Sequence, residues 1–209
     1  MYYSKQHKSR KRIDSLYKVS TCASLALLIL AVPLSFILPV SASFENGLLE
    51  NLQIVVILFG SCYNLFLAAR TFDRQIKYFH LWCAALLVFL AFRELSWGRV
   101  FYPIDMEDTG PVFIAMSDYA WRTEVHIIIV VYLLLLLMFM LLNVPLRRML
   151  RCRIPYNVIL LMALAVLFSY IGDHGILFGK LQGQIVEEIG ELVFYMLIPA
   201  LCIHYHREL

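Results

Sequence analysis

The chain has 209 residues, of which 61% are hydrophobic and 16% charged. A soluble domain carries roughly a quarter charged residues, so this composition argues against an ordinary soluble protein. The net charge is +3, and the Lys and Arg residues lie beside apolar blocks, where membrane topology explains them without nucleic-acid binding.

The apolar residues fall in blocks long enough to cross a bilayer, which takes about 20 residues of α-helix. We predict an all-α membrane bundle, with a basic segment at residues 1–18 and six transmembrane helices within residues 19–206. The predicted spans, in chain order, are residues 19–40, 48–69, 78–97, 125–142, 158–171 and 185–204. Val40-Ser41-Ala42 resembles a signal-peptide cleavage site, but the preceding block is longer than a typical signal and long enough to span.

The basic residues indicate how the bundle is oriented. If six helices alternate, fourteen of the eighteen Lys and Arg residues lie on the side of the termini, and twelve of the fifteen acidic residues lie on the other side. Cytoplasmic connections of membrane proteins carry the excess of Lys and Arg. We therefore predict a multi-pass protein of the plasma membrane with both termini in the cytoplasm.

Polar residues gather toward the predicted outer ends of five spans. Charged residues inside membrane helices are costly, about 2.5–3.5 kcal/mol each on insertion scales, and are usually functional. The residues concerned are Glu50, Asn51, Gln53, Arg93, Glu94, Glu124, His126, Tyr170, Asp173, His174, Gln184, Glu187, Glu188 and Glu191. Their shared depth predicts a site at the outer face.

The polar residues of the last span follow helical spacing. They recur at intervals of three, four and seven residues and so share one helix face: Gln184, Glu187, Glu188, Glu191 and Tyr195. Three close carboxylates in a low-dielectric place cannot all be ionised cheaply, so they must be protonated, paired with an arginine or bound to a cation. A purely structural alternative stays open, because acidic residues also suit helix N-termini and an Arg–Glu pair can fix helix packing.

These residue types suggest distinct roles at the site. Arg93 would hold an anionic headgroup, while Glu94, Glu187 and Glu191 would act as general acids, general bases or cation ligands. Asp173 and either His126 or His174 would assist them. His126, His174 and Glu188 could bind a divalent metal ion, although no HExxH or ExxH spacing supports such a site. Glu50 and Trp97 are further candidates at the same depth.

The longest outer connection covers residues 99–123. Its segment VFIAMSDYAW is short, apolar and aromatic, so it could lie along the membrane surface as a lid over the site. The simpler alternative, which we favour, is an interfacial anchor formed by Tyr119 and Trp121.

The motif FRELSWGR ends the third span and EEIGEL opens the last one. These two motifs resemble those of a family of bacterial inner-membrane proteins to which no activity is assigned. The family carries REL(S/D)(W/F) or EE-S-W-G, and some members carry a late EExxEL. The matching residues are Arg93, Glu94, Leu95, Trp97, Gly98, Glu187, Glu188 and Glu191. Members of the second type often have Asp where Ser96 stands, and the resemblance implies a bacterial plasma-membrane protein.

Three functions remain open from the sequence. The leading one is a membrane-embedded enzyme that acts on a lipid or lipid-linked substrate at the outer leaflet. The second is a transporter in which the acidic stripe carries protons or cations, although the inner half shows few polar residues for a path. The third is a non-catalytic partner or assembly subunit of a membrane complex, with a structural polar cluster.

Overall fold

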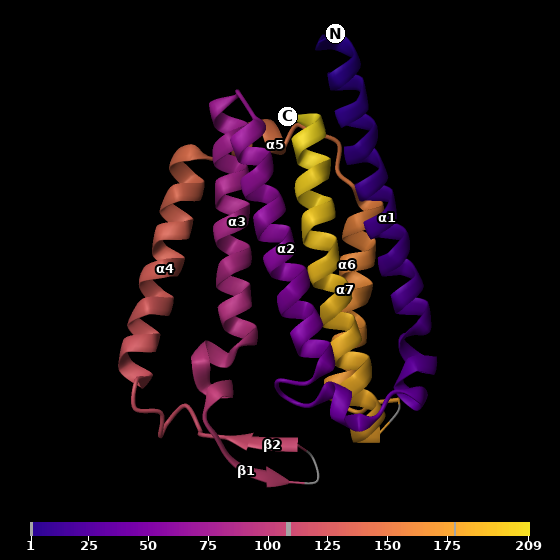
Figure 1. Cartoon of the computed structure of the whole chain (residues 1–209), viewed down its shortest axis with the longest axis vertical. Coiled ribbons are helices and arrows are strands. Elements are labelled where there is room, and N and C mark those ends of the chain that lie inside the picture. The colour runs from indigo at the N-terminus through magenta and orange to yellow at the C-terminus, as the bar shows by residue number, and fades with distance from the viewer. Residues whose placement is uncertain (1, 108–109, 178) are drawn as a thin grey trace. The chain divides into compact units, whose positions relative to one another are not determined.

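The computed structural model is mostly helical (Figure 1), and it describes residues 2–107, 110–177 and 179–209, with side chains over 15–106, 111–177 and 179–209. The basic side chains of the N-terminal segment up to residue 14 therefore lie outside the described part. The elements are α1 (Tyr2–Ile37), η1 (Val40–Ser43), α2 (Leu48–Arg70), α3 (Arg74–Glu94), η2 (Ser96–Phe101), β1 (Pro103–Glu107), β2 (Gly110–Phe113), α4 (Arg122–Asn143), α5 (Leu146–Met149), α6 (Tyr156–Asp173) and α7 (Gly179–Glu208).

Within the described chain, five helices are long and apolar enough to cross a membrane. They are residues Ser15–Ile37 of α1, η1 with α2 over Val40–Arg70, and the helices α3, α4 and α6. A multi-pass membrane protein is therefore confirmed. The sixth predicted span falls on α7, whose 30 residues would rise about 45 Å. Its first half carries three glutamates, and α7 is not among these five helices.

The described chain divides into two compact units. Unit 1 joins residues 1–38 to residues 151–209 and holds α1, α6 and α7, while unit 2 covers residues 39–150. In unit 1, α7 packs against both α6 and α1. The Ser20 hydroxyl of α1 donates to the Met196 carbonyl of α7 over 2.8 Å, which satisfies a polar group between two apolar helices.

Small residues bring α6 and α7 into backbone contact. A Cβ added at Gly172 would lie 2.5 Å from the Gly183 carbonyl oxygen. A Cβ added at Gly190 would lie 2.8 Å from the Ala165 carbonyl oxygen and from the Ser169 nitrogen. Because membrane helices gain little from burying apolar side chains, close approach at small residues is a usual way for them to associate.

In unit 2, α3 lies between α2 and α4 (Figure 1). A buried polar pair joins α2 to α3, with the Asn64 Oδ1 atom 2.8 Å from His80 Nδ1. The Ser61 hydroxyl donates to the Ala84 carbonyl over 3.1 Å. These contacts satisfy the polar groups inside the helix pair, where an unpaired one would be costly.

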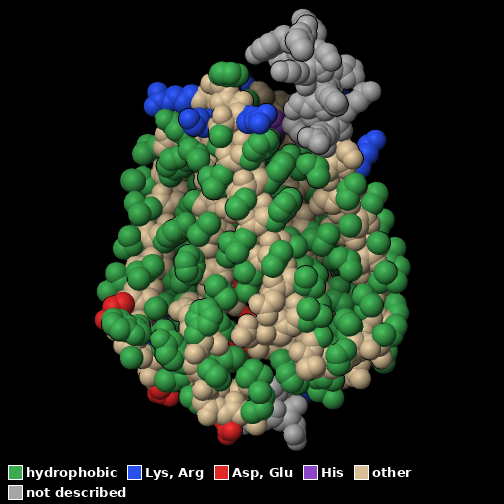
Figure 2. Space-filling view, in the orientation of Figure 1, with side chains coloured by type: hydrophobic (Ala, Val, Ile, Leu, Met, Phe, Trp, Pro, Cys, Tyr) green, Lys and Arg blue, Asp and Glu red, His purple; other side chains and the backbone are tan. Residues whose placement is uncertain are grey.

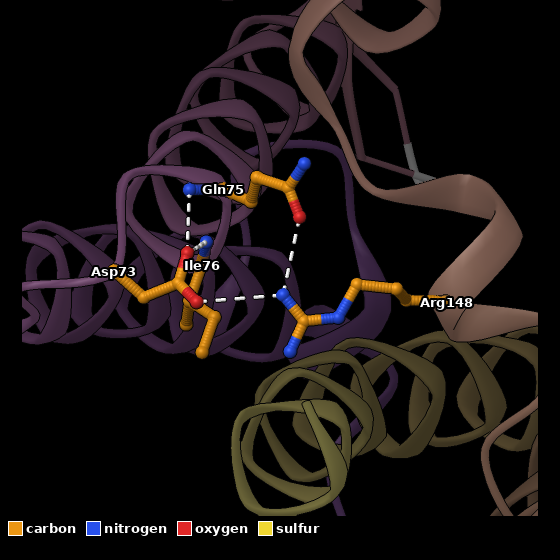
Figure 3. Close-up of polar contacts among 4 residues, drawn as sticks. All are labelled: Asp73, Gln75, Ile76 and Arg148. Carbon is orange, nitrogen blue, oxygen red and sulfur yellow. Dashed lines mark hydrogen bonds and ion pairs between the residues drawn. The ribbon is translucent and has the colours of Figure 1, made fainter.

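Asp73 caps the start of α3 and links it to α5 (Figure 3). Its Oδ1 accepts from the backbone N–H groups of Gln75 at 2.8 Å and Ile76 at 3.3 Å, and its Oδ2 lies 3.4 Å from Arg148 Nη1. Arg148 also donates to the Gln75 side chain over 3.1 Å. The backbone N–H groups, with Arg148 adding to them, hold the pKa of Asp73 below its ordinary value.

The helix surfaces that Figure 2 shows are mostly apolar. The helix α4 shows this best. All its residues are described, and Leu136 alone is buried. Such a helix suits contact with lipid.

The third span ends earlier than predicted. The helix α3 stops at Glu94 and not at residue 97, because Ser96, Trp97 and Gly98 have φ values of 44°, 56° and 93°. These left-handed values cannot continue a right-handed helix. Arg93 and Glu94 are consequently the last residues of α3.

The connection between α3 and α4 contains an antiparallel hairpin of β1 and β2. Val112 and Phe113 begin the apolar segment that could form a surface lid, and both lie in strand β2. The bundle is therefore helical apart from this hairpin and the two 3₁₀ turns of the described chain. A lid role for the remainder stays a prediction.

Candidate functional site

Unit 1 brings acidic residues of α6 and α7 together. Gly172 lies against the backbone of Glu187, since a Cβ there would be 2.6 Å from the Glu187 nitrogen. Asp173 follows Gly172, and its charge acts on Glu187 together with the charges of Glu191 and His174. The structure thus places three predicted site residues, Asp173, His174 and Glu191, within electrostatic range of Glu187.

The polar face of α7 runs from an exposed end to a buried one. Gln184 is exposed, Glu187 and Glu191 are half-buried, and Tyr195 is 2% exposed. The predicted helical spacing of these residues is matched by one continuous helix, α7. The carboxylates therefore lie between solvent and the apolar interior, where charge is costly but access is retained.

His174 is held at the end of α6 beside this acidic group. Its Nδ1 lies 3.0 Å from the Tyr170 carbonyl oxygen and 3.4 Å from Asp173 Oδ2. The two rings of His174 and Tyr170 have centroids 4.2 Å apart. A neutral ring that donates from Nδ1 leaves Nε2 as its acceptor nitrogen, which is the form a general base requires.

In unit 2, Arg93 and Glu94 lie beside each other at the end of α3. The Arg93 Nη1 atom is 3.5 Å from Glu94 Oε1, and the side chains are 53% and 7% exposed. The buried carboxylate thus has a cation next to it, while much of the guanidinium faces outward. This geometry is compatible with the predicted role of Arg93 in holding an anionic group.

The contacts of Glu50 favour a structural role. Glu50 occupies the third helical position after the N-cap Gly47, and its carboxylate accepts a hydrogen bond from the backbone N–H of Asn46. A glutamate at this position commonly reaches back to satisfy a free N–H group at a helix start. Glu50 therefore stabilises the entry to α2, where Asn46 has a φ of 62°.

The motif FRELSWGR forms a tight turn braced by Glu45, a residue that the sequence reasoning missed. The Ser96 hydroxyl donates to Glu45 Oε1 over 2.9 Å, and Arg99 Nη2 lies 3.6 Å from the same oxygen. Trp97 stacks on Phe92 with centroids 6.0 Å apart and an interplanar angle of 10°. The sequence gives a weak signal for Glu45: it is an acidic residue in the short connection between the first two spans, on the same predicted side of the membrane as Ser96 and Arg99.

The predicted site residues divide between the two units. Asp173, Glu187 and Glu191 belong to unit 1, while Arg93 and Glu94 belong to unit 2. Each group is brought together within its own unit. A single cluster of all five stays a prediction.

The predicted metal ligands divide in the same way. His126 lies in the first turns of α4 in unit 2, and His174 and Glu188 lie in unit 1. Among the residues that the structure describes, no three His, Cys, Asp or Glu side chains are grouped as metal ligands would be. A divalent metal held by this trio therefore stays a prediction.

Comparisons with protein-family models, curated proteins and solved structures give no match. The family resemblance carried by FRELSWGR and EEIGEL consequently stays a prediction. The function must be argued from the site itself.

Proposed function

We propose that the chain is a six-span protein of the bacterial plasma membrane whose outer-face carboxylates catalyse acid–base chemistry on a lipid or lipid-linked substrate. The observation that carries this proposal is the contact between Gly172 and the Glu187 backbone. It sets Asp173 and Glu187 beside each other on two rigid helices. Functional groups held by helices are positioned more accurately than groups on loops.

The chemistry follows from the proximity of like charges. The charges of Asp173 and Glu191 both act on Glu187, so a state with all three ionised is disfavoured. One carboxylate that keeps its proton can act as a general acid, while an ionised neighbour acts as a general base. His174, which lies beside Asp173 and is exposed, can relay a proton to or from solvent.

Access for a lipid follows from the depth of the acidic face. Glu187 lies eight residues after the start of α7, which corresponds to about 12 Å along the helix axis. If α7 is the sixth span, this depth lies near the boundary between headgroups and acyl chains. A reacting bond close to a lipid headgroup would meet the carboxylates there, without leaving the membrane.

Lipid conversion by the purified protein tests this proposal. The protein would be reconstituted in nanodiscs with a bacterial lipid extract, and changes in the lipid species would be followed by mass spectrometry. We expect one lipid species to be converted, and Glu187→Gln to slow that conversion about 100-fold. The matched control is Glu208→Gln, which removes a glutamate from the other end of the same helix. The proposal fails if no lipid changes, or if Glu187→Gln converts it as fast as the control.

Proton- or cation-coupled transport is the second candidate, and a line of buried polar residues in unit 2 favours it. Glu50, Gln53, Ser61 and Asn64 recur along α2 and are all buried, as is His80 on α3. Ser61, Asn64 and His80 are the members of this line that lie in the predicted inner half of unit 2. Eight residues, or about 12 Å, separate Gln53 from Ser61, and Ile57 is fully buried between them, so the line is interrupted.

Flux measurements separate the two candidates. A pH-sensitive dye inside proteoliposomes would report proton entry, and transport requires that His80→Leu and Glu187→Gln both abolish it. Both variants could instead lower only the stability of the protein and change neither lipid conversion nor proton entry. The third function, a non-catalytic partner in a membrane complex, would then remain.

A further inference from the structure

An apolar groove of about 250 Å³ lies between α3 and α4 in unit 2. It is lined by Leu81, Trp82, Ala85, Tyr132, Leu135 and Phe139. Both helices are long and apolar enough to span the membrane, and the lining residues lie away from the first and last turns of both, so the groove lies within the span.

Two hydrogen bonds hold the walls of this groove at a fixed spacing. The Trp82 Nε1–H group donates to the Leu136 carbonyl over 3.1 Å, and the Tyr132 hydroxyl donates to the Ala85 carbonyl over 2.9 Å. Each bond crosses from one helix to the other. The polar atoms of both aromatic side chains are thereby satisfied, so the groove presents mainly carbon to an occupant.

The groove leads to a basic end of the same two helices. Phe139, in the groove wall, packs edge-on against Tyr78 with centroids 5.7 Å apart. The Arg74 Nε–H group donates to the Tyr78 hydroxyl over 2.9 Å, and its guanidinium carbon lies 5.2 Å from the ring centroid. Lys77 and Arg147 are exposed at this end as well. A continuous path of contacts therefore joins the apolar groove to exposed positive charge.

We propose that this groove binds one acyl chain of an anionic phospholipid, with Arg74 and Lys77 holding the phosphate. An acyl chain suits the groove because the occupant must be apolar and must come from within the membrane. The tail of any phospholipid is apolar enough for the groove, so the tail determines where the lipid binds. The charge of the headgroup determines which phospholipid is preferred. The site is independent of the outer-face carboxylates, and neither proposal depends on the other.

The test measures lipids retained by the purified protein in native mass spectrometry, with phosphatidylglycerol and phosphatidylcholine of identical chains as probes. We expect phosphatidylglycerol to be retained in preference to phosphatidylcholine. Ala85→Phe fills the groove and should lower phosphatidylglycerol retention to the level of phosphatidylcholine. The matched control, Ala69→Phe, adds the same side chain at an exposed position on α2 and should leave retention unchanged.

A second pair of variants tests the headgroup contact. Arg74→Gln should weaken phosphatidylglycerol binding about fivefold, the usual contribution of one basic side chain near an anionic lipid. Arg70→Gln is the control, because it removes the same charge near the end of α2, where its guanidinium lies 4.7 Å over the Phe66 ring. Equal losses in both variants would show general attraction to a basic surface and would overturn the proposal.

Photo-crosslinking of the unmodified protein keeps the proposal testable if a variant does not fold. Phosphatidylglycerol with a carbene-forming group in its acyl chain should label peptides that contain residues 81–85 and 132–139. Labelling spread evenly over α2 and α4, or equal labelling by the phosphatidylcholine probe, would overturn the site.

Discussion

At the scale of single residues, Asp73 stands where the chain leaves α2 and starts α3. Its Oδ1 satisfies two N–H groups that have no partner within the helix, and its Oδ2 contacts Arg148. Asp73→Ala should lower the free energy of unfolding by about 1 kcal/mol, while Asp73→Asn, which keeps a capping oxygen, should cost less. Unfolding of the purified protein in mixed micelles would measure both. Equal losses in the two variants would show that the cap does not act through this oxygen.

The same residue predicts a pH dependence. The pKa of Asp73 is lower in the folded chain than its ordinary value, chiefly through the Gln75 and Ile76 N–H groups. Its contribution to stability is therefore present above the ordinary carboxyl pKa, near 4, and is lost as the pH falls through the folded value. Between pH 5 and pH 2, Asp73→Asn should lose less stability than the unmodified protein. Asp118→Asn, at an exposed loop position, should follow the unmodified protein.

The neighbours of a side chain could be predicted from the sequence where they follow from the helical period. They could not be predicted where they follow from a local backbone turn. Glu187 and Glu191 could be placed on one face because α7 is regular. The partnership of Glu45 with Ser96 could not, since it depends on a left-handed turn at residues 96–98. The spacing of residue types does not predict such a turn, because residues in it do not follow the 3.6-residue period of a helix.

At the scale of elements, the packing of α6 on α7 depends on glycine. Gly190→Ala would place a Cβ 2.8 Å from two backbone atoms of α6, which cannot move without shifting the helix. We expect Gly190→Ala to destabilise the protein by about 1–3 kcal/mol through overpacking. Ala163→Leu, at an exposed position of α6, is the control and should change stability by less than about 0.5 kcal/mol. Micelle unfolding curves for the two variants would decide this.

The glycine contact also links stability to the candidate site. Gly172→Ala would separate α6 from α7 beside Glu187, so it should change the chemistry of the carboxylates as well as the packing. Gly190→Ala acts through Ala165 and Ser169, farther along both helices. If Gly172→Ala lowers lipid conversion more than Gly190→Ala at matched stability, the contact positions the site. If both lower it in proportion to stability, the contact serves packing alone.

Helix positions were predictable from the sequence because apolar blocks of span length have few alternative structures in lipid. Each predicted span falls on a helix, and the error at the end of α3 arises where residues 96–98 turn left-handed. The contact between α6 and α7 was not predicted. This contact depends on small residues, which a search for apolar blocks does not single out: Ala165, Ser169, Gly172, Gly183 and Gly190.

At the scale of the whole molecule, the number of spans decides on which sides the termini lie. Five spans place them on opposite sides of the membrane, and six place them on the same side. The helix α7 is the element in question, because it is not among the five candidate spans and its first half carries Glu187, Glu188 and Glu191. The distribution of Lys and Arg favours six by one residue: six spans put fourteen of the eighteen on the basic side and five put thirteen there, because only Arg207 changes side.

Reporter fusions test this topology directly. We expect a green fluorescent protein fused after Leu209 to fluoresce, which it does only in the cytoplasm, and alkaline phosphatase fused there to be inactive. Phosphatase fused after Asp118 should be active, and phosphatase fused after Phe72 should not. An active phosphatase after Leu209 would show that α7 does not cross. The carboxylates of α7 would then lie on a surface helix, and the proposal of an outer-leaflet site within a six-span bundle would have to be abandoned.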